Sequence, residues 1–204
     1  MRKWLLFILF LWFSQAASTL QAQHDRPYRL YGNAEGFFGT YAGFTYQFVY
    51  TNQKQTSFAA GISSGWRPSP LVPAGYISSF DLPITLRSLL RGDETIDNFT
   101  HLHALAGKAF NVTKNGKVRL NMLSGLSLGL FREAVNWQEK PMRFLDGNYR
   151  YDLQYHFRPS IMIQPKLEFA FDEHYGLSFS PLAQFNTHRN CYGFTVGLMV
   201  GTLR

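Results

Sequence analysis

Residues 118–130 read VRLNMLSGLSLGL, and this stretch decides the fold because its side chains change character at every second position. One face carries the apolar residues Val118, Leu120, Met122, Leu126, Leu128 and Leu130, with Ser124 as an exception. The other face carries the polar or small residues Arg119, Asn121, Gly125, Ser127 and Gly129. Successive side chains of a β-strand point to opposite faces of a sheet, so the stretch predicts a strand with one apolar face.

The same alternation returns in the last third of the chain, where it predicts strands over 157–171, 175–186 and 192–201. These runs are about 10 residues or longer, the length that crosses a bilayer at a tilt. A soluble sandwich also alternates, but its strands average about 5–6 residues. Only 16% of the residues are charged and 17% are aromatic, whereas soluble domains carry about 25% charged residues. The outer face is therefore expected to meet lipid.

The first half predicts four further strands, over 38–50, 56–66, 77–87 and 99–110. Together these patterns predict an all-β fold, a transmembrane antiparallel up-and-down β-barrel of about eight strands. Short links at 111–117 and 172–174 and long links near 88–98 and 132–156 fit short periplasmic turns and longer external loops. The links at 51–55 and 67–75 do not fit that alternation. Proline cannot donate to a ladder, so Pro83, Pro159, Pro165 and Pro181 are expected at bulges or strand ends.

The N-terminus has the pattern of a secretory signal peptide. Basic Arg2 and Lys3 precede an apolar run from Trp4 to Phe13, and small residues follow it. The apolar run is too short to span a bilayer, although a buried helix or an uncleaved anchor is the alternative. Cleavage after Ala22 would divide the chain into a signal peptide, 1–22, and a barrel domain, 23–204. Export and a barrel together predict the outer membrane of a Gram-negative bacterium.

A barrel of eight strands has an interior only wide enough for side chains. Five charged residues would point inward in the predicted register: Asp81, Arg87, Arg119, Lys166 and Glu168. Charges of both signs in a narrow lumen predict a packed network of ion pairs rather than a diffusion pore. The alternative is that some of these charges lie at the water-exposed ends of the strands.

The sequence offers no complete catalytic or cofactor site. His101 and His103 share one face of a predicted strand and could chelate a metal or lie beside a serine, but no further ligand accompanies them. Cys191 has no cationic neighbours that would activate a thiolate. The net charge of +7 is not gathered into a Lys/Arg run. We therefore expect no enzyme, no cofactor, no metal and no direct nucleic-acid binding.

The predicted loop at 132–156 combines aromatic and charged residues, as protein-contact loops do. Its candidate contact residues are Glu133, Asn136, Trp137, Asp146, Tyr149 and Tyr151. An aromatic girdle at the membrane interface is the alternative explanation for the aromatic residues.

Two resemblances to known families rest on short motifs. The sequence Gln-Ala-Gln at 21–23 and the run Phe-Asp-Leu-Pro-Ile at 80–84 resemble small outer-membrane barrels of Bacteroidetes. Glu133 and Asn136 at their spacing, then Leu-Asp-Gly at 145–147, resemble the conjugative-transposon transfer protein TraO over roughly residues 118–200. Arg132 stands where that family has tyrosine, and no tyrosine separates Leu145 from Asp146. The TraO resemblance implies an outer-membrane component of a mating apparatus, without catalysis.

Three functions remain open from the sequence. The first is a non-enzymatic barrel that contacts outer-membrane lipid and other envelope or conjugation proteins. The second is a generic structural or adhesive barrel of the porin-like superfamily. The third is a lipid-modifying outer-membrane enzyme.

Overall fold

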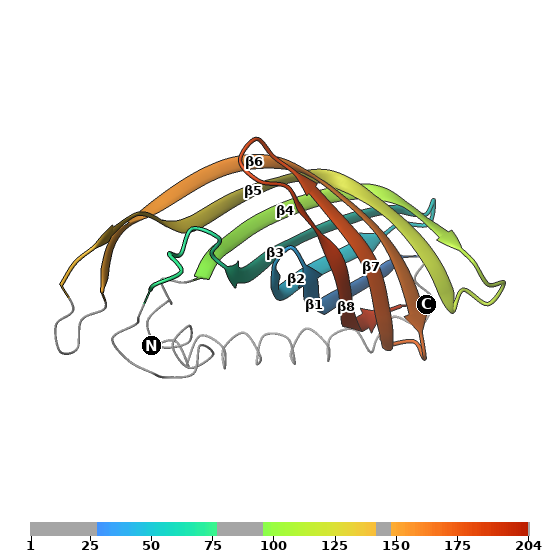
Figure 1. Cartoon of the computed structure of the whole chain (residues 1–204). Helices are drawn as coiled ribbons and strands as arrows, with labels where there is room; N and C mark the ends of the chain where they lie inside the picture. Colours follow the sequence, from blue (N-terminus) through green and yellow to red (C-terminus); the bar gives the residue numbers. More distant parts are fainter. Residues whose placement is uncertain (1–27, 77–95, 142–147, 204) are drawn as a thin grey trace, which may run out of the picture.

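The structure is a closed antiparallel barrel of eight strands (Figure 1). It is a computed structural model that describes residues 28–76, 96–141 and 148–203. The strands are β1 (Arg29–Gly39), β2 (Ala42–Thr51), β3 (Thr56–Pro68), β4 (Ile96–Asn111), β5 (Val118–Glu139), β6 (Tyr149–Ala170), β7 (Tyr175–Phe185) and β8 (Cys191–Thr202). Each strand pairs with the next, and β1 pairs with β8 from Leu30↔Thr202 to Gly39↔Gly193. The predicted fold class is confirmed. No helix in the described ranges is long and apolar enough to cross a membrane.

The first predicted strand, 38–50, is wrong because it contains a turn. β1 ends at Gly39 and β2 begins at Ala42, and the two strands pair through Phe38↔Ala42. Phe38 and Ala42 are four positions apart, so the even-numbered side chains face outward in both strands and the period of two continues through the turn. The predicted strand at 77–87 lies outside the described residues. The number of strands therefore agrees with the expectation, but the first half is divided differently.

This division of the first half explains why the predicted links at 51–55 and 67–75 did not follow the alternation of short turns and long loops. Short connections at 52–55, 112–117 and 171–174 lie at the same end of the barrel as the start of β1 and the end of β8. The strand ends that flank the connections 40–41, 69–95, 140–148 and 186–190 lie at the other end. Outer-membrane barrels keep short turns in the periplasm and longer loops outside. The first end is thus the periplasmic end, and the second is the external mouth.

The outer face of the strands is apolar and exposed, which suits a lipid environment. Its central residues include Leu102, Leu126, Ile161 and Leu198, all more than half exposed. Aromatic residues mark both ends, with Trp66 and Tyr192 near the mouth and Tyr50, Phe110 and Tyr175 near the periplasmic turns. Two such girdles are typical of membrane barrels because aromatic rings favour the headgroup level.

The described prolines lie where the ladder is interrupted or ends. Pro165 and Pro181 fall between the β6–β7 pairs Ile163↔Ala183 and Leu167↔Phe179, in a stretch without paired residues. The Ser180 hydroxyl donates to the Pro165 carbonyl at 2.8 Å across this gap. Pro159 pairs only with β5, because β7 ends opposite Ile161. Pro165 and Pro181 thus fit the expected interruption of the ladder. Pro159 instead lies inside β6, where one side of the strand has no partner; Pro83 lies outside the described residues.

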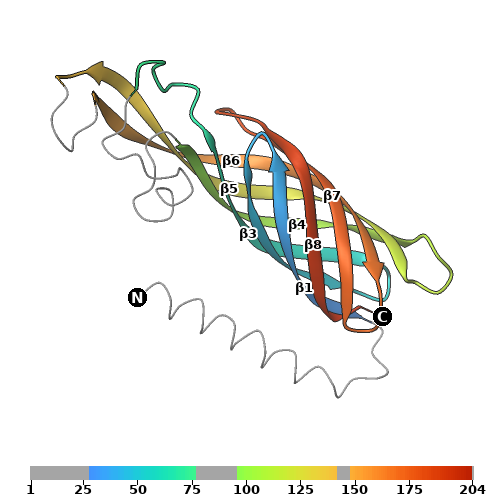
Figure 2. The same ribbon diagram turned by 60° about the horizontal axis from the view of Figure 1, so that its bottom comes forward.

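The hairpin of β5 and β6 projects beyond the other strands at the mouth (Figure 2). Each of its strands has 22 residues, about twice the 9–11 needed to cross a bilayer. The β4–β5 ladder reaches Asn98↔Arg132, and the β6–β7 ladder reaches Ile161↔Phe185. The predicted loop at 132–156 is therefore mostly strand. Its charged residues and a bulge between Val135 and Gln138 hide the alternation.

We predict that a charge on the outer face is costly at mid-barrel and tolerated at the periplasmic end. Leu126→Arg should destabilise the folded protein by about 2–4 kcal/mol, whereas Val112→Arg should cost about 0–1 kcal/mol. Leu126 is 69% and Val112 61% exposed, so the two variants differ in depth rather than in packing. Urea unfolding in phospholipid vesicles measures both. Equal costs would contradict a lipid-facing outer surface.

Candidate functional site

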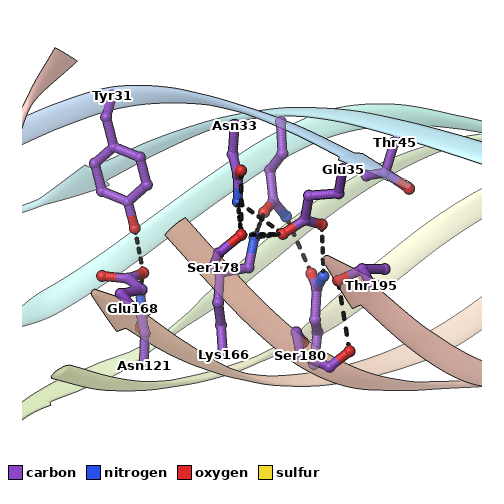
Figure 3. Close-up of polar contacts among 12 residues, drawn as sticks. Tyr31, Asn33, Glu35, Thr45, Asn121, Lys166, Glu168, Ser178, Ser180 and Thr195 are labelled. Carbon is purple, nitrogen blue, oxygen red and sulfur yellow. Dashed lines mark hydrogen bonds and ion pairs between the residues drawn. The ribbon is translucent and has the colours of Figure 1, made fainter. Parts of the chain in front are cut away.

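The periplasmic half of the lumen is filled by an ion pair between β5 and β6. Arg119 donates to Glu168 Oε2 from Nε at 3.0 Å and from Nη2 at 2.8 Å. Asn121 and the Tyr31 hydroxyl both donate to Glu168 Oε1 (Figure 3). Arg119 Nη1 also donates to the Leu203 carbonyl. All lone pairs and protons of such a buried pair need partners, and this arrangement supplies most of them.

A second network, centred on Glu35, crosses the middle of the lumen. Lys166 Nζ lies 2.8 Å from Glu35 Oε1, and neither side chain is exposed. The same oxygen accepts from Ser178 at 2.9 Å and from Asn33 at 2.7 Å (Figure 3). Lys166 also donates to Gln47 Oε1, and Gln164 donates to Glu35 Oε2 at 3.3 Å. Residues from four strands, β1, β2, β6 and β7, thereby lock the interior.

A glycine on β8 leaves the space that the Glu35 side chain occupies. Gly197 lies opposite Glu35 in the β1–β8 ladder. A Cβ atom at Gly197 would lie 2.5 Å from Glu35 Cγ and 2.4 Å from the Ala34 carbonyl oxygen. Glycine is therefore required at this position for the strands and the carboxylate to approach so closely.

Three predicted lumen residues, Arg119, Lys166 and Glu168, lie inside the barrel in these networks, and Asp81 and Arg87 lie outside the described residues. Glu35 is a lumen residue that was not predicted from the sequence. No strand was predicted over 29–37, although inward Tyr31, Asn33 and Glu35 alternate there with outward Leu30 and Ala34. That alternation was the signal that would have revealed it.

His101 and His103 also face the lumen rather than a water-exposed strand end. They are 2% and 4% exposed, and the His101 ring stacks on Phe99 at 5.0 Å. Gln47 Oε1 accepts from Lys166, so the Gln47 amide nitrogen donates to His103 Nε2 at 3.3 Å. The described residues bring no third metal ligand to this pair. Neither ring nitrogen of His101 has a hydrogen-bond partner, so the pair offers packing and the one hydrogen bond of His103, not a recognisable catalytic set.

The mouth holds a separate charged cluster that the sequence did not reveal. Asp97 Oδ2, at the start of β4, accepts from Arg67 Nη2 at 2.9 Å and from Arg189 Nη1 at 3.0 Å. Arg189 Nη1 also lies 2.9 Å from Glu133 Oε1, and His188 Nε2 lies 3.3 Å from Glu133 Oε2. These residues come from β3, β4, β5 and the link 186–190. Only closure of the barrel brings them together.

Tyr41, in the β1–β2 turn, closes the cluster from one side. The Arg67 guanidinium lies over its ring at 5.0 Å, and the ring packs edge-on against Phe99 at 4.7 Å. Burial raises the pKa of the Tyr41 hydroxyl above its ordinary value.

The candidate contact residues separate into two groups. Glu133 does not lie in a loop as predicted: it is 5% exposed and belongs to the mouth cluster. Asn136 is exposed at the bulge, where its φ of 55° suits asparagine, and its amide donates to Asp152 at 3.1 Å. Asp146 lies outside the described residues. The three aromatic residues, Trp137, Tyr149 and Tyr151, gather with Tyr76 near the bulge.

This aromatic cluster, Tyr76, Trp137, Tyr149 and Tyr151, fixes the outer end of the described hairpin, next to the 140–148 connection. The Trp137 ring lies 5.0 Å from Tyr151 and 5.2 Å from Tyr76, between ring centroids. The Trp137 indole donates to the Ala134 carbonyl at 3.1 Å, and Asn148 donates to the Gly75 carbonyl at 2.7 Å. Edge-to-face ring pairs contribute about 0.5–1.5 kcal/mol each beyond buried area. The cluster thus joins the β3–β4 connection to the projecting hairpin.

Comparisons with known proteins support the fold alone. No family model and no curated protein matches the chain. The N-terminal β-barrel domain of Pseudomonas aeruginosa OprF is 12% identical, with a TM-score of 0.50, over 85% of this chain and 96% of that domain. Ail, the attachment invasion locus protein of Yersinia pestis, is 10% identical, with a TM-score of 0.48, over 85% and 95% of the two chains. The chain has the fold of a small outer-membrane barrel. That fold agrees with the predicted Gram-negative outer membrane.

We predict strong coupling between Glu35 and Lys166. Glu35→Met leaves a buried ammonium without its carboxylate and should destabilise the barrel by about 3–5 kcal/mol. Adding Lys166→Met should recover part of that loss, giving a coupling energy of about 1–3 kcal/mol in a double-mutant cycle. Urea unfolding of the four proteins measures it. Strictly additive losses would show that the pair does not act as a unit.

Proposed function

We propose that this protein is a non-enzymatic outer-membrane scaffold that holds its β5–β6 hairpin outside the membrane for contact with another envelope protein. The observation that carries this proposal is the length of the hairpin relative to the rest of the barrel. On β5 beyond Arg132 and on β6 before Ile161, the described strands β4 and β7 provide no ladder partner. A strand edge of this kind is a surface on which another chain can add a strand.

The side chains of the hairpin support a contact role. Leu153, Tyr155 and Phe157 face one side of β6, and they are 46%, 58% and 62% exposed. Asp152 and Gln154 occupy the opposite side and are also exposed. Aromatic residues beside charges are favoured in protein contacts. The aromatic cluster and the bulge hold the outer part of the hairpin in one conformation, which lowers the entropy lost on binding.

The filled lumen argues against a pore as the main role. The networks around Glu35 and Glu168 cross the interior, so solute flow would require several ion pairs to break together. The absence of catalysis is part of the same proposal. It is supported by the packed surroundings of His101 and His103.

We predict that a photo-crosslinking residue on the hairpin captures protein in intact cells. The probe at Leu153 should give a discrete protein adduct, whereas the same probe at Leu126, on the lipid-facing barrel wall, should give none. Immunoblots against the barrel, followed by mass spectrometry of the adduct, read out both positions. Adducts with lipopolysaccharide alone at Leu153 would overturn the contact role and leave only interfacial anchoring.

The narrower proposal is that the partner belongs to a conjugative transfer apparatus, as in TraO proteins. It rests on the spacing of Glu133 and Asn136 and on the following Leu-Asp-Gly motif. Glu133 lies in the mouth cluster at the base of the proposed contact hairpin, and Asn136 lies in the bulge further along it. A generic structural or adhesive barrel is the broader alternative.

We predict that deletion of the gene lowers the frequency of conjugative transfer at least tenfold. The full-length gene should restore it, and a version with residues 138–150 replaced by a short turn should not, although that barrel still reaches the outer membrane. Unchanged transfer after deletion would exclude the conjugative role. The crosslinking result would still decide whether the hairpin contacts a protein.

A further inference from the structure

Three possible metal ligands converge at the mouth from three separate segments. Glu133 comes from β5, His156 from β6 and His188 from the link between β7 and β8. One ligand atom from each residue lies within 4.8 Å of the other two. The two imidazole rings lie 4.3 Å apart between centroids, with an angle of 32° between their planes. Glu133 is buried, and both histidines are partly exposed, so the group lies at the edge of the packed interior.

The group lacks the hydrogen bonds that would explain it as a purely structural cluster. Glu133 Oε1 and His188 Nε2 are both buried and have no hydrogen-bond partner. Arg189 lies close to Glu133 Oε1, and His188 close to Oε2, but neither contact has hydrogen-bond geometry. Buried polar atoms are nearly always satisfied in folded proteins, so two such atoms side by side call for a missing partner.

We propose that Glu133, His156 and His188 bind a divalent transition-metal ion of the Zn²⁺ type. Two imidazoles and one carboxylate are a ligand set that Zn²⁺ and Cu²⁺ favour over Mg²⁺ or Ca²⁺. Tetrahedral Zn²⁺ with bonds of about 2.0–2.2 Å keeps its ligand atoms about 3.4 Å apart. His188 Nε2 and Glu133 Oε2 are already 3.3 Å apart, so mainly His156 must approach. The fourth position would hold water.

Arg189 can move from Glu133 to Asp97 when an ion binds. Arg189 Nη1 already contacts Asp97 Oδ2 at 3.0 Å. Asp97 Oδ1 is buried without a hydrogen-bond partner, so it can accept a further N–H from Arg189 when Glu133 turns to the metal. The positive charges of Arg189 and Arg67 oppose a cation nearby. This opposition favours ions that bind imidazole strongly over ions held by charge alone.

Metal binding would have a structural consequence for the mouth. The ion would tie β5, β6 and the 186–190 link together at the base of the projecting hairpin. Ligands from three segments lower the freedom of all three, so the metal form should resist unfolding better than the metal-free form. This inference does not depend on whether the hairpin has a protein partner.

The experiment uses the full-length protein, extracted from membranes in detergent, without a histidine tag and treated with EDTA. Calorimetric titration with ZnCl₂ should show one bound ion per chain, and excess Mg²⁺ should not compete. His156→Ala, His188→Asn and Glu133→Gln should each weaken binding at least tenfold. His174→Ala is the matched control, because the contacts of His174 in the β6–β7 turn are made by its backbone.

A second measurement separates metal binding from folding defects. Zn²⁺ should raise the urea midpoint of the wild type and of His174→Ala, but not that of the three ligand variants. Far-ultraviolet circular dichroism shows whether each variant keeps its sheet. Wild-type protein that binds no Zn²⁺, or folded ligand variants that bind it as tightly as wild type, would overturn the proposal.

Discussion

Closure of the sheet between β1 and β8 is the constraint on which the rest of the structure depends. In lipid every backbone N–H and C=O must be paired within the protein, and an open sheet would leave two unpaired edges. The β1–β8 ladder removes both of them. Closure with eight strands in turn fixes a narrow interior. The inward side chains must then either be small or satisfy one another.

The lumen and the projecting hairpin satisfy their polar side chains in different ways. Inside the barrel, Glu35 and Glu168 each accept several hydrogen bonds in addition to an ion pair, so the buried charges are compensated. Beyond the mouth, β5 and β6 are no longer enclosed by neighbours. There the bulge at Asn136, the aromatic cluster and the contacts of Glu133 hold the hairpin. Side chains at the mouth are therefore better candidates for binding a ligand or partner than side chains in the lumen.

The alternation of residues was sufficient to predict the fold class, the last two strands and the second part of β6, because each has an apolar face. It failed at the β1–β2 turn, where the last paired residues are four positions apart and the parity of the outward positions is therefore preserved. It failed again beyond Arg132, where the bulge shifts that parity and charged residues replace apolar ones. The inward direction of Arg119, Lys166 and Glu168 followed from parity, but their partners did not. Glu35 lies in a strand that was not recognised.

The mouth cluster could not be predicted from the sequence for a different reason. Arg67, Asp97, Glu133 and Arg189 are far apart in the chain, and only the register of the closed barrel brings them into contact. The sequence instead drew attention to His101 and His103, whose spacing is local. Those two residues face the filled lumen. Local spacing identifies residues on one face of a strand, whereas a site built across strands requires the register.

The central claim, a closed barrel that resides in the outer membrane, is tested most directly by electrophoresis of isolated outer membranes with and without heating. A closed barrel keeps its sheet in cold detergent and migrates faster than the boiled, unfolded chain. The account predicts two bands that interconvert on heating, both from the outer-membrane fraction. Identical migration of the two samples, with the protein soluble in the absence of detergent, would contradict it.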